Sequence, residues 1–138
     1  MARIMIIEDD EEMRSLLKDF FEEEGFETDS VSNGVDALRM LSRDHFDLVI
    51  TDIRMPGLTG LDILPRIRRL KPGTPIIVMT AYGSDDARRR SFERGATIYL
   101  EKPIHLSQLR TVIREMVLRK SLEQTWSNAE SQLRKGGE

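Results

Sequence analysis

The sequence predicts a single α/β domain built around a parallel β-sheet. Short, nearly continuous apolar runs alternate along the chain with segments of helical spacing, and strict strand–helix alternation is typical of parallel sheets with right-handed crossovers. The length of 138 residues, with 39% hydrophobic and 33% charged residues, suits one compact soluble domain. Because such sheets bind ligands at the carboxyl ends of their strands, we expect the functional residues there.

Five segments are predicted to be strands. Four are nearly continuous apolar runs, which are typical of strands covered on both faces. A fifth, more alternating segment is predicted to be an edge strand of the same sheet. The four apolar runs are Ile4–Ile7, Phe46–Thr51, Ile76–Met79 and Ile98–Leu100, and the edge strand is Glu27–Val31.

Helices are predicted in the segments between and after these strands. The first should end at Gly25, since glycine is a common helix C-terminal cap, and Ser84 should cap the fourth. Asp10 and Glu11 are interpreted as acids that cap the first helix. The predicted helices are approximately Met13–Phe21, Val35–Leu41, Leu61–Leu70, Asp85–Arg94 and a fifth from Leu106.

Composition excludes several classes of function. The formal net charge is −3 and there is no basic tract, so we expect no direct contact with nucleic acid. The absence of cysteine excludes disulfides, thiolate metal sites and cysteine nucleophiles. The apolar segment after Arg3 is too short for a signal peptide or a membrane span, which favours a cytoplasmic protein with no membrane contact.

Chemically active residues follow four of the predicted strands. They are Glu8 and Asp9 after the first strand, Asp52 after the third, Thr80 after the fourth and Lys102 after the fifth. Clustered carboxylates repel one another, and oxygen ligands without histidine or cysteine suit Mg²⁺ as the cation that relieves the repulsion. A lysine and a hydroxyl beside such a site would hold the oxygens of a transferring phosphoryl group. Asp52 is then the predicted nucleophile.

The motifs that carry these residues, taken in their order along the chain, resemble those of the response-regulator receiver family of two-component signalling. The resemblance covers about residues 3–118, so residues 1–118 are predicted to be a receiver domain and residues 119–138 a helical extension or linker. It implies a flavodoxin-like, three-layer (βα)5 fold with a five-stranded parallel sheet in the order 2-1-3-4-5. The motifs are Ile4-Met5-Ile6-Ile7-Glu8-Asp9-Asp10, Asp52 with Met55-Pro56-Gly57 and Gly60, Met79-Thr80-Ala81, and Lys102-Pro103.

The resemblance assigns roles to the residues at the strand ends. It implies that Asp52 accepts a phosphoryl group from a sensor histidine kinase and that Lys102 contacts this group. Asp9 would bind Mg²⁺ directly and Glu8 mostly through water, with Asp52 and the backbone carbonyl of Arg54 as further ligands. The domain would catalyse its own phosphorylation and dephosphorylation without being an enzyme for an external substrate.

The resemblance also implies a switch. Thr80 would bind a phosphoryl oxygen, and Tyr99 would turn inward as Thr80 moves. Arg54 and Tyr82, two residues beyond Asp52 and Thr80, would tune the lifetime of the phosphoryl group. The Lys102-Pro103 bond is expected to be cis.

Phosphorylation is expected to change the surface formed by the fourth helix, fifth strand and fifth helix, which would then control a partner protein or an output domain. Formation of a homodimer on phosphorylation is one way in which this surface could act. The triplet Arg88-Arg89-Arg90 is interpreted as a solvated helix face or as part of this surface. Receivers of nitrogen-regulatory transcription activators often continue their last helix into a linker. The resemblance to them implies that this chain acts in transcription regulation and in a phosphorelay. The repeat of Leu122, Trp126, Ala129 and Leu133 is interpreted as a short coiled-coil seam or a fraying helix end, and the chain as a stand-alone receiver or a fragment.

Two other identities share this architecture or chemistry. Flavodoxin binds its flavin phosphate with hydroxyls and glycine amides after the first strand, whereas this chain has five successive acids at residues 8–12 that would repel a phosphate. A magnesium phosphohydrolase needs a second acid two residues beyond its nucleophile, and that position is Arg54. Both identities are therefore disfavoured.

Overall fold

The computed structural model describes residues 2–55, 57 and 59–136, without the side chains of residues 117, 120–124, 135 and 136. Its strands form one sheet, in which every neighbouring pair is parallel and the order is β2-β1-β3-β4-β5. This confirms the predicted fold class and strand order. The strands are β1 (Arg3–Ile7), β2 (Glu27–Val31), β3 (Leu48–Asp52), β4 (Ile76–Thr80) and β5 (Ile98–Glu101).

The helices connect the strands as expected. The predicted caps are present: the Asp10 side chain accepts from the backbone N–H groups of Glu12 and Met13, and Ser84 accepts from Ala87. Gly25 follows the first helix with φ of 94°, a left-handed conformation that favours glycine. The helices are α1 (Glu11–Glu23), α2 (Gly34–Arg43), α3 (Gly60–Leu70), α4 (Asp85–Glu93) and α5 (Leu106–Gly136).

The predicted start of the third strand is wrong, while the other predicted strand ends lie within one residue of those in the structure. Phe46 was expected to begin the third strand, but β3 begins at Leu48 and extends to Asp52. Phe46 is fully buried in the preceding loop, so it belongs to the core without having strand conformation. An apolar run records burial, which loops and strands share, and therefore does not fix where a strand begins.

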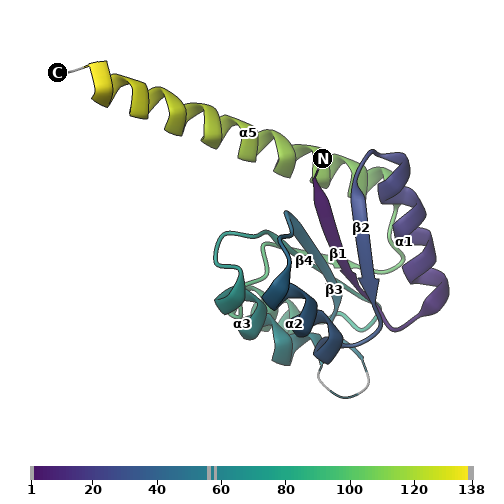
Figure 1. Ribbon diagram of the computed structural model, residues 1–138. Coiled ribbons are helices and arrows are strands. Elements are labelled where there is room, and N and C mark those ends of the chain that lie inside the picture. Colours follow the sequence, from purple (N-terminus) through teal and green to yellow (C-terminus); the bar gives the residue numbers. More distant parts are fainter. Residues whose placement is uncertain (1, 56, 58, 137–138) are drawn as a thin grey trace. The chain divides into compact units, whose positions relative to one another are not determined.

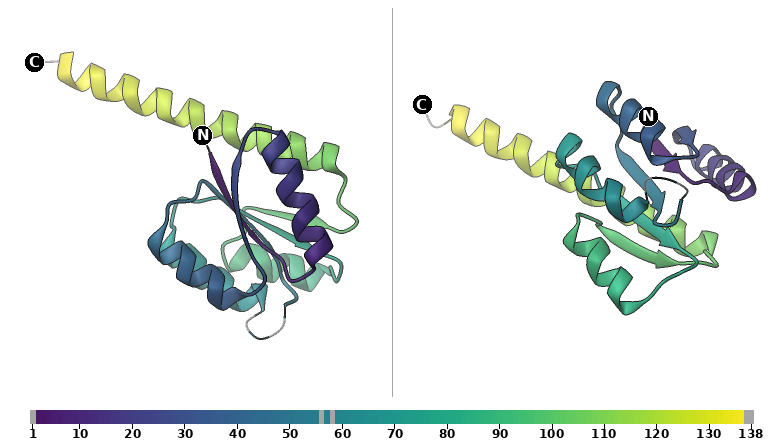
Figure 2. Two further views of the ribbon diagram at one scale, coloured as in Figure 1. Left: turned by 45° about the vertical axis from the view of Figure 1, so that its right-hand side comes forward. Right: turned by 90° about the horizontal axis from the view of Figure 1, so that it is seen from below.

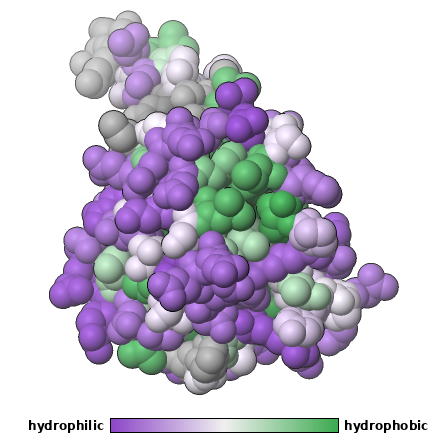
Figure 3. Space-filling view, turned by 90° about the vertical axis from the view of Figure 1, so that its right-hand side faces the viewer, coloured by the Kyte–Doolittle hydropathy of each residue, from purple (hydrophilic) through white to green (hydrophobic). Residues whose placement is uncertain are grey.

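Helices cover both faces of the sheet. Figures 1 and 2 show α1 on one face and the pair α2 and α3 on the other. On the α2 and α3 face, side chains such as Met5, Val49 and Val78 form a continuous core with Leu41 and Ile63. Most of the surface on the α1 side is hydrophilic, because the outward residues of α1 are largely acidic (Figure 3).

The chain divides into two compact units, one through Ile104 and one from His105 onward. The second unit consists of α5, a continuous helix to Gly136, so the segment predicted as a helical extension is helical as far as it is described. The end of the receiver domain at residue 118 stays a prediction. In the described part of the chain, no helix combines the length and apolar character needed to cross a bilayer.

Parallel pairing brings distant residues to one edge of the sheet. Glu8 directly follows β1, and Asp52 and Thr80 are the last residues of β3 and β4. Thr80 pairs with Glu101, so Lys102 emerges from β5 at the same level. The carboxyl ends of four strands therefore present the predicted functional residues side by side.

Candidate functional site

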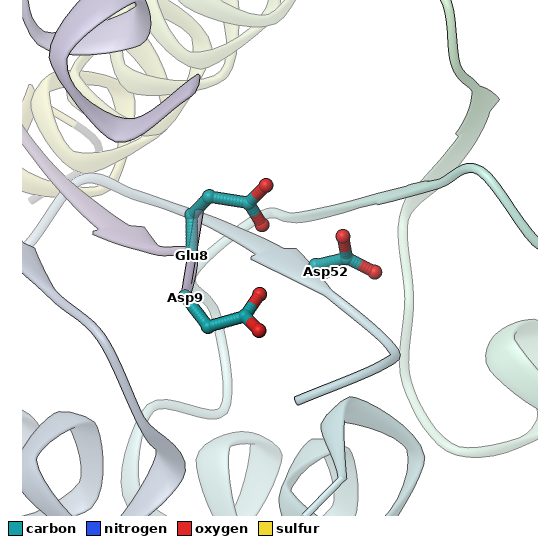
Figure 4. A group of neighbouring side chains, drawn as sticks. All are labelled: Glu8, Asp9 and Asp52. Carbon is teal, nitrogen blue, oxygen red and sulfur yellow. The ribbon is translucent and has the colours of Figure 1, made fainter. Parts of the chain in front are cut away.

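Three carboxylates converge at the carboxyl edge of the sheet. Glu8, Asp9 and Asp52 each place a carboxylate oxygen within 4.8 Å of the others. Figure 4 shows Glu8 and Asp9, from the end of β1, directing their carboxyl groups toward the side of Asp52. Glu8 is fully buried and Asp52 is 6% exposed, whereas Asp9 is exposed. The structure thus brings together the three carboxylates that the sequence predicted.

Lys102 joins two of these carboxylates. Its Nζ donates to Glu8 Oε1 and to Asp52 Oδ2, each at 2.7 Å. Burial by itself would lower the pKa of Lys102, but the hydrogen bonds and negative charges of Asp52 and Glu8 outweigh this effect and raise it. The lysine is therefore charged and held between the two acids.

The two carboxylate oxygens of Glu8 differ in their hydrogen bonding. Glu8 Oε2 is buried and has no hydrogen-bond partner in the described part of the chain. Burial raises the pKa of Glu8 to about 7, although Lys102 opposes the rise. A buried, unsatisfied oxygen next to two other carboxylates is a place where a bound cation would be stabilising.

Local backbone packing positions Asp52. Its Oδ1 accepts from the backbone N–H of Arg54 at 3.0 Å, so both carboxylate oxygens have a donor. Gly60 begins α3 and donates its N–H to the carbonyl of Ile53 at 3.0 Å. A Cβ atom at Gly60 would overlap the Asp52 carbonyl oxygen and Ile53 Cα, so only glycine allows α3 to begin this close to β3.

The carboxylates open into a pocket of about 690 Å³. The Arg54 guanidinium lies over the Tyr82 ring, 4.0 Å from its centroid, and Tyr82 is 61% exposed. Two loops, after β3 and after β4, therefore meet across the mouth of the pocket. The lining comprises Glu8, Asp9, Asp10, Met13, Asp52, Arg54, Met55, Thr59, Ala81, Tyr82 and Lys102.

Met13, Met55 and Thr59 line the pocket but were not predicted as site residues. Met13 shares the apolar spacing of the first helix, so its sequence position indicated only core packing. Thr59 could have been recognised as the cap of α3, because its side chain accepts from the Asp62 N–H, but a cap gives no sign of a pocket. Pro56, which belongs to the predicted motif, lies outside the described residues, as does the Leu122 side chain of the predicted seam.

The two predicted switch residues are buried and do not line the pocket. Thr80 is fully buried, and its hydroxyl accepts from the Tyr82 N–H at 3.0 Å; it is not among the lining residues. Tyr99 is 7% exposed, so its ring lies inward. The Lys102-Pro103 peptide bond is cis, as expected.

The donor set fits Mg²⁺. It offers carboxylate oxygens from Glu8, Asp9 and Asp52, which are the hard ligands that this ion prefers, and the buried Glu8 Oε2 has no hydrogen-bond partner among the described residues. The Arg54 N–H is engaged with Asp52, and the metal-binding role of the Arg54 carbonyl stays a prediction. A bound magnesium ion would supply charge neutralisation for phosphoryl transfer at this edge.

Comparison with known proteins places this geometry in a family. The model of the response regulator receiver domain matches residues 4–114. The chain is 34% identical over 119 residues to sporulation initiation phosphotransferase F of Bacillus subtilis, covering 86% of this chain and 96% of that protein. It is 37% identical over 110 residues to the DNA-binding transcriptional regulator NtrC of a Bradyrhizobium strain, covering 80% of this chain but only 23% of that regulator.

Solved structures agree with the sequence matches. A CheY-like receiver domain protein from Methanospirillum hungatei superposes with a TM-score of 0.86 at 28% identity, covering 89% of this chain and 98% of that one. The response regulator TrrA from Thermotoga maritima, solved with Mg²⁺ and BeF, gives a TM-score of 0.77 at 35% identity and covers 84% and 99% of the two chains. The chain therefore belongs to the response regulator receiver domain family, which acts in phosphorylation-based two-component signalling and is phosphorylated by histidine kinases.

Proposed function

We propose that this chain takes a phosphoryl group from a sensor histidine kinase onto Asp52 in a Mg²⁺-dependent reaction and uses it to change its binding surface. The observation that carries the proposal is the position of Lys102, within 2.7 Å of both Glu8 and Asp52, beside a cluster of three carboxylates. The TrrA relative was solved with Mg²⁺ and BeF, which supports a similar use of this pocket.

In the proposed transfer, a carboxylate oxygen of Asp52 attacks the phosphorus atom of the kinase's phosphohistidine. An O–P bond forms and the P–N bond breaks, and the histidine, whose other ring nitrogen already carries a proton, leaves as a neutral imidazole. Asp52 Oδ1 and Oδ2 are already oriented by the Arg54 N–H and Lys102. Lys102 would then donate hydrogen bonds to the phosphoryl oxygens as negative charge develops on them, because the lysine is charged and already at the site.

Glu8, Asp9 and Asp52 would hold the magnesium ion, with Asp9 as the accessible ligand and Glu8 beneath it. Because Lys102 is hydrogen bonded to Glu8 as well as Asp52, the lysine would have to share these acids with the ion. The carboxylates total three negative charges when ionised, so a divalent cation and one lysine together balance the site.

The proposed readout begins at Thr80. To bind a phosphoryl oxygen, the Thr80 hydroxyl would donate its O–H while it still accepts from the Tyr82 N–H, so movement of Thr80 would draw in the loop that leads to α4. The surface of α4 and β5 would thereby be biased toward one of two pre-existing states. Control of transcription through an output domain is part of the proposal, supported by the similarity to NtrC, of which this chain spans about a quarter.

Intact-mass spectrometry tests the phosphoryl transfer. Incubation with Mg²⁺ and a small acyl phosphate should add one phosphoryl group to the wild-type chain and none to Asp52→Asn. Removal of Mg²⁺ with a chelator should prevent the addition to the wild-type chain. Labelling that persists in Asp52→Asn would show that another residue is the acceptor, and Asp44→Asn, on the loop after α2, is a control that should label normally.

A further inference from the structure

The loop between β4 and α4 passes very close to Tyr99. Gly83 lies in this loop, just before the helix cap Ser84. A Cβ atom placed on Gly83 would lie 2.9 Å from the Tyr99 hydroxyl oxygen and 2.5 Å from Glu101 Oε1. Contacts this short do not occur between real atoms, so an added methyl group would require one of these neighbours to move.

The backbone itself does not require glycine at this position. Gly83 is not among the described glycines with positive φ, which are Gly25, Gly57 and Gly95. An alanine could therefore adopt the same backbone conformation, and the neighbouring side chains alone oppose it. The contact with Tyr99, rather than the turn geometry, makes glycine necessary.

The two neighbours differ in how easily they can move. Glu101 is exposed and presents only the end of a flexible side chain, so it can rotate away at little cost. Tyr99 is a rigid ring, 7% exposed and packed into the core cluster with Val78. Tyr99 is therefore the neighbour whose position an added methyl group would change.

The Tyr99 hydroxyl has little to hold it in its buried position. In the described part of the chain it has no hydrogen-bond partner, and burial raises the pKa of Tyr99, an effect that the nearby Ser84 backbone partly offsets. An unsatisfied buried hydroxyl costs free energy in the buried state, which lowers the resistance of the ring to displacement by an added methyl group.

The far end of α4 is fixed more firmly. Arg94, the C-terminal cap of α4, donates to the Leu61 carbonyl of α3 at 2.9 Å. Arg68 of α3 donates to the Gly95 carbonyl at 2.6 Å and to the Thr74 carbonyl at the same distance. Movement of the helix is therefore easier at its N-terminal end, where Gly83 lies.

We infer that Gly83 is a positioning residue for Tyr99: its missing side chain leaves the space in which the tyrosine hydroxyl lies when the ring is inward. Through Tyr99, Gly83 then sets how readily the loop after β4 follows a phosphoryl group on Asp52. This second step rests on the proposed function, whereas the effect of Gly83 on the ring does not.

NMR of the full chain with ring-labelled tyrosine tests the inference in the unphosphorylated protein. The chain has two tyrosines, Tyr82 and Tyr99, so each ring can be followed by itself. A soluble paramagnetic agent should broaden Tyr82 and spare Tyr99 in the wild type. In Gly83→Ala the Tyr99 ring should become exposed to the agent, and in Gly73→Ala, where an added Cβ would meet nothing within 4 Å, it should stay protected.

A rescue variant separates steric contact from general damage. Tyr99→Phe removes only the hydroxyl that an alanine at position 83 would touch, so Gly83→Ala combined with Tyr99→Phe should regain the melting temperature that Gly83→Ala loses. Glu101→Ala should give no such rescue. Protection of Tyr99 that survives in Gly83→Ala, or equal rescue by both second changes, would overturn the inference.

Binding of beryllofluoride with Mg²⁺ then tests the link to Asp52. If the inward ring favours the phosphorylated state, Gly83→Ala should bind beryllofluoride about 5-fold more weakly than the wild type. An exposed Tyr99 ring with unchanged beryllofluoride affinity would overturn the link while leaving the steric role. Failure of the wild type to bind beryllofluoride would instead overturn the proposed function, and the ring measurement would still decide the role of Gly83.

Discussion

At the scale of single residues, the site buries two of its three carboxylates, Glu8 and Asp52, beside a lysine. Glu8 is fully buried, yet its neighbours include Asp52 as well as the cation Lys102. Removing a carboxylate from water disfavours its ionised form, and one lysine shared between two acids compensates only in part. The raised pKa of Glu8 follows from this competition, because burial outweighs the lysine.

The titration of Glu8 makes the stability of the metal-free protein depend on pH. Its pKa is raised by folding from 4.5 to about 7, so the folded state binds the proton more tightly than the unfolded chain does. This contribution to stability is fully present below pH 4.5 and is lost as the pH rises through about 7. In chelator, the free energy of unfolding should fall by roughly 1–3 kcal/mol between about pH 5 and 8.

Glu8→Gln should remove most of this loss, because glutamine does not titrate. Glu11→Gln changes an exposed acid in the first turn of α1 and should keep the wild-type pH dependence. Urea unfolding at several pH values measures the effect. The same slope in Glu8→Gln as in the wild type would assign the titration to another group.

The stacked pair at the pocket mouth should control the lifetime of the phosphoryl group on Asp52. The Arg54 guanidinium covers the Tyr82 ring and both residues line the pocket, so together they would restrict the approach of water to a phosphoryl group. An exposed cation–π contact contributes about 0.5–1 kcal/mol, so Arg54→Ala or Tyr82→Ala should each speed dephosphorylation by about 2- to 5-fold without preventing labelling. Decay of the phosphorylated mass with time gives the rate.

The double variant distinguishes a stacked lid from two independent residues. If Arg54 and Tyr82 act as one pair, changing both should speed decay by less than the product of the single effects. Arg39→Ala, an exposed arginine on α2, should decay at the wild-type rate. Unchanged decay in all variants would rule out shielding by this pair.

At the scale of secondary-structure elements, the start of α3 depends on one glycine. Gly60 lies against the backbone of Asp52 and Ile53, where even a methyl group has no room. Gly60→Ala should therefore push α3 away from β3 and lower the free energy of unfolding by about 2 kcal/mol, as other overpacked sites do. Because β3 ends in Asp52, phosphorylation by an acyl phosphate should also slow.

Gly73→Ala is the matched control for this change. Gly73 follows α3, has open space around its Cα and does not have positive φ, so alanine should be neutral or slightly stabilising there. Denaturant unfolding of the two variants compares them directly. Equal stability of Gly60→Ala and Gly73→Ala would mean that α3 can shift without cost.

At the scale of the whole molecule, we expect phosphorylation to change self-association. The arginines of α4 were candidates for an interface, but Arg89 already pairs with Asp86 and Glu93, and Arg90 with Asp86. Contacts with a second copy would have to replace these intrahelical pairs, so their net gain is small. The exposed Phe92, which packs with Arg88, adds an apolar contribution on the same helix.

Sedimentation with and without Mg²⁺ and beryllofluoride should therefore show a higher average mass in the beryllofluoride state, with association that weakens moderately as salt rises. Asp52→Asn should show no response to beryllofluoride. The same mass for the wild type in both states would indicate that another protein or an output domain reads the switch.

The sequence by itself determined the architecture and the chemical composition of the site. Alternation of apolar runs with helical segments placed the strands and helices, and residue types placed the caps at Asp10, Ser84 and Gly25 and the acids at the strand ends. The strand order came from the resemblance to receiver domains. The strand boundary at Phe46 was missed because a buried loop residue and a buried strand residue look alike in sequence.

The tertiary structure decided what the side chains do to one another. Lys102 lies 94 positions from Glu8 and 50 from Asp52, and no spacing rule shows that one ammonium joins both carboxylates. Nor could it show that Gly60 touches the Asp52 backbone or that Gly83 faces the Tyr99 hydroxyl. Periodicity records which face of an element is buried, whereas contacts between elements depend on how the sheet and helices pack, and that packing exists only in the folded chain.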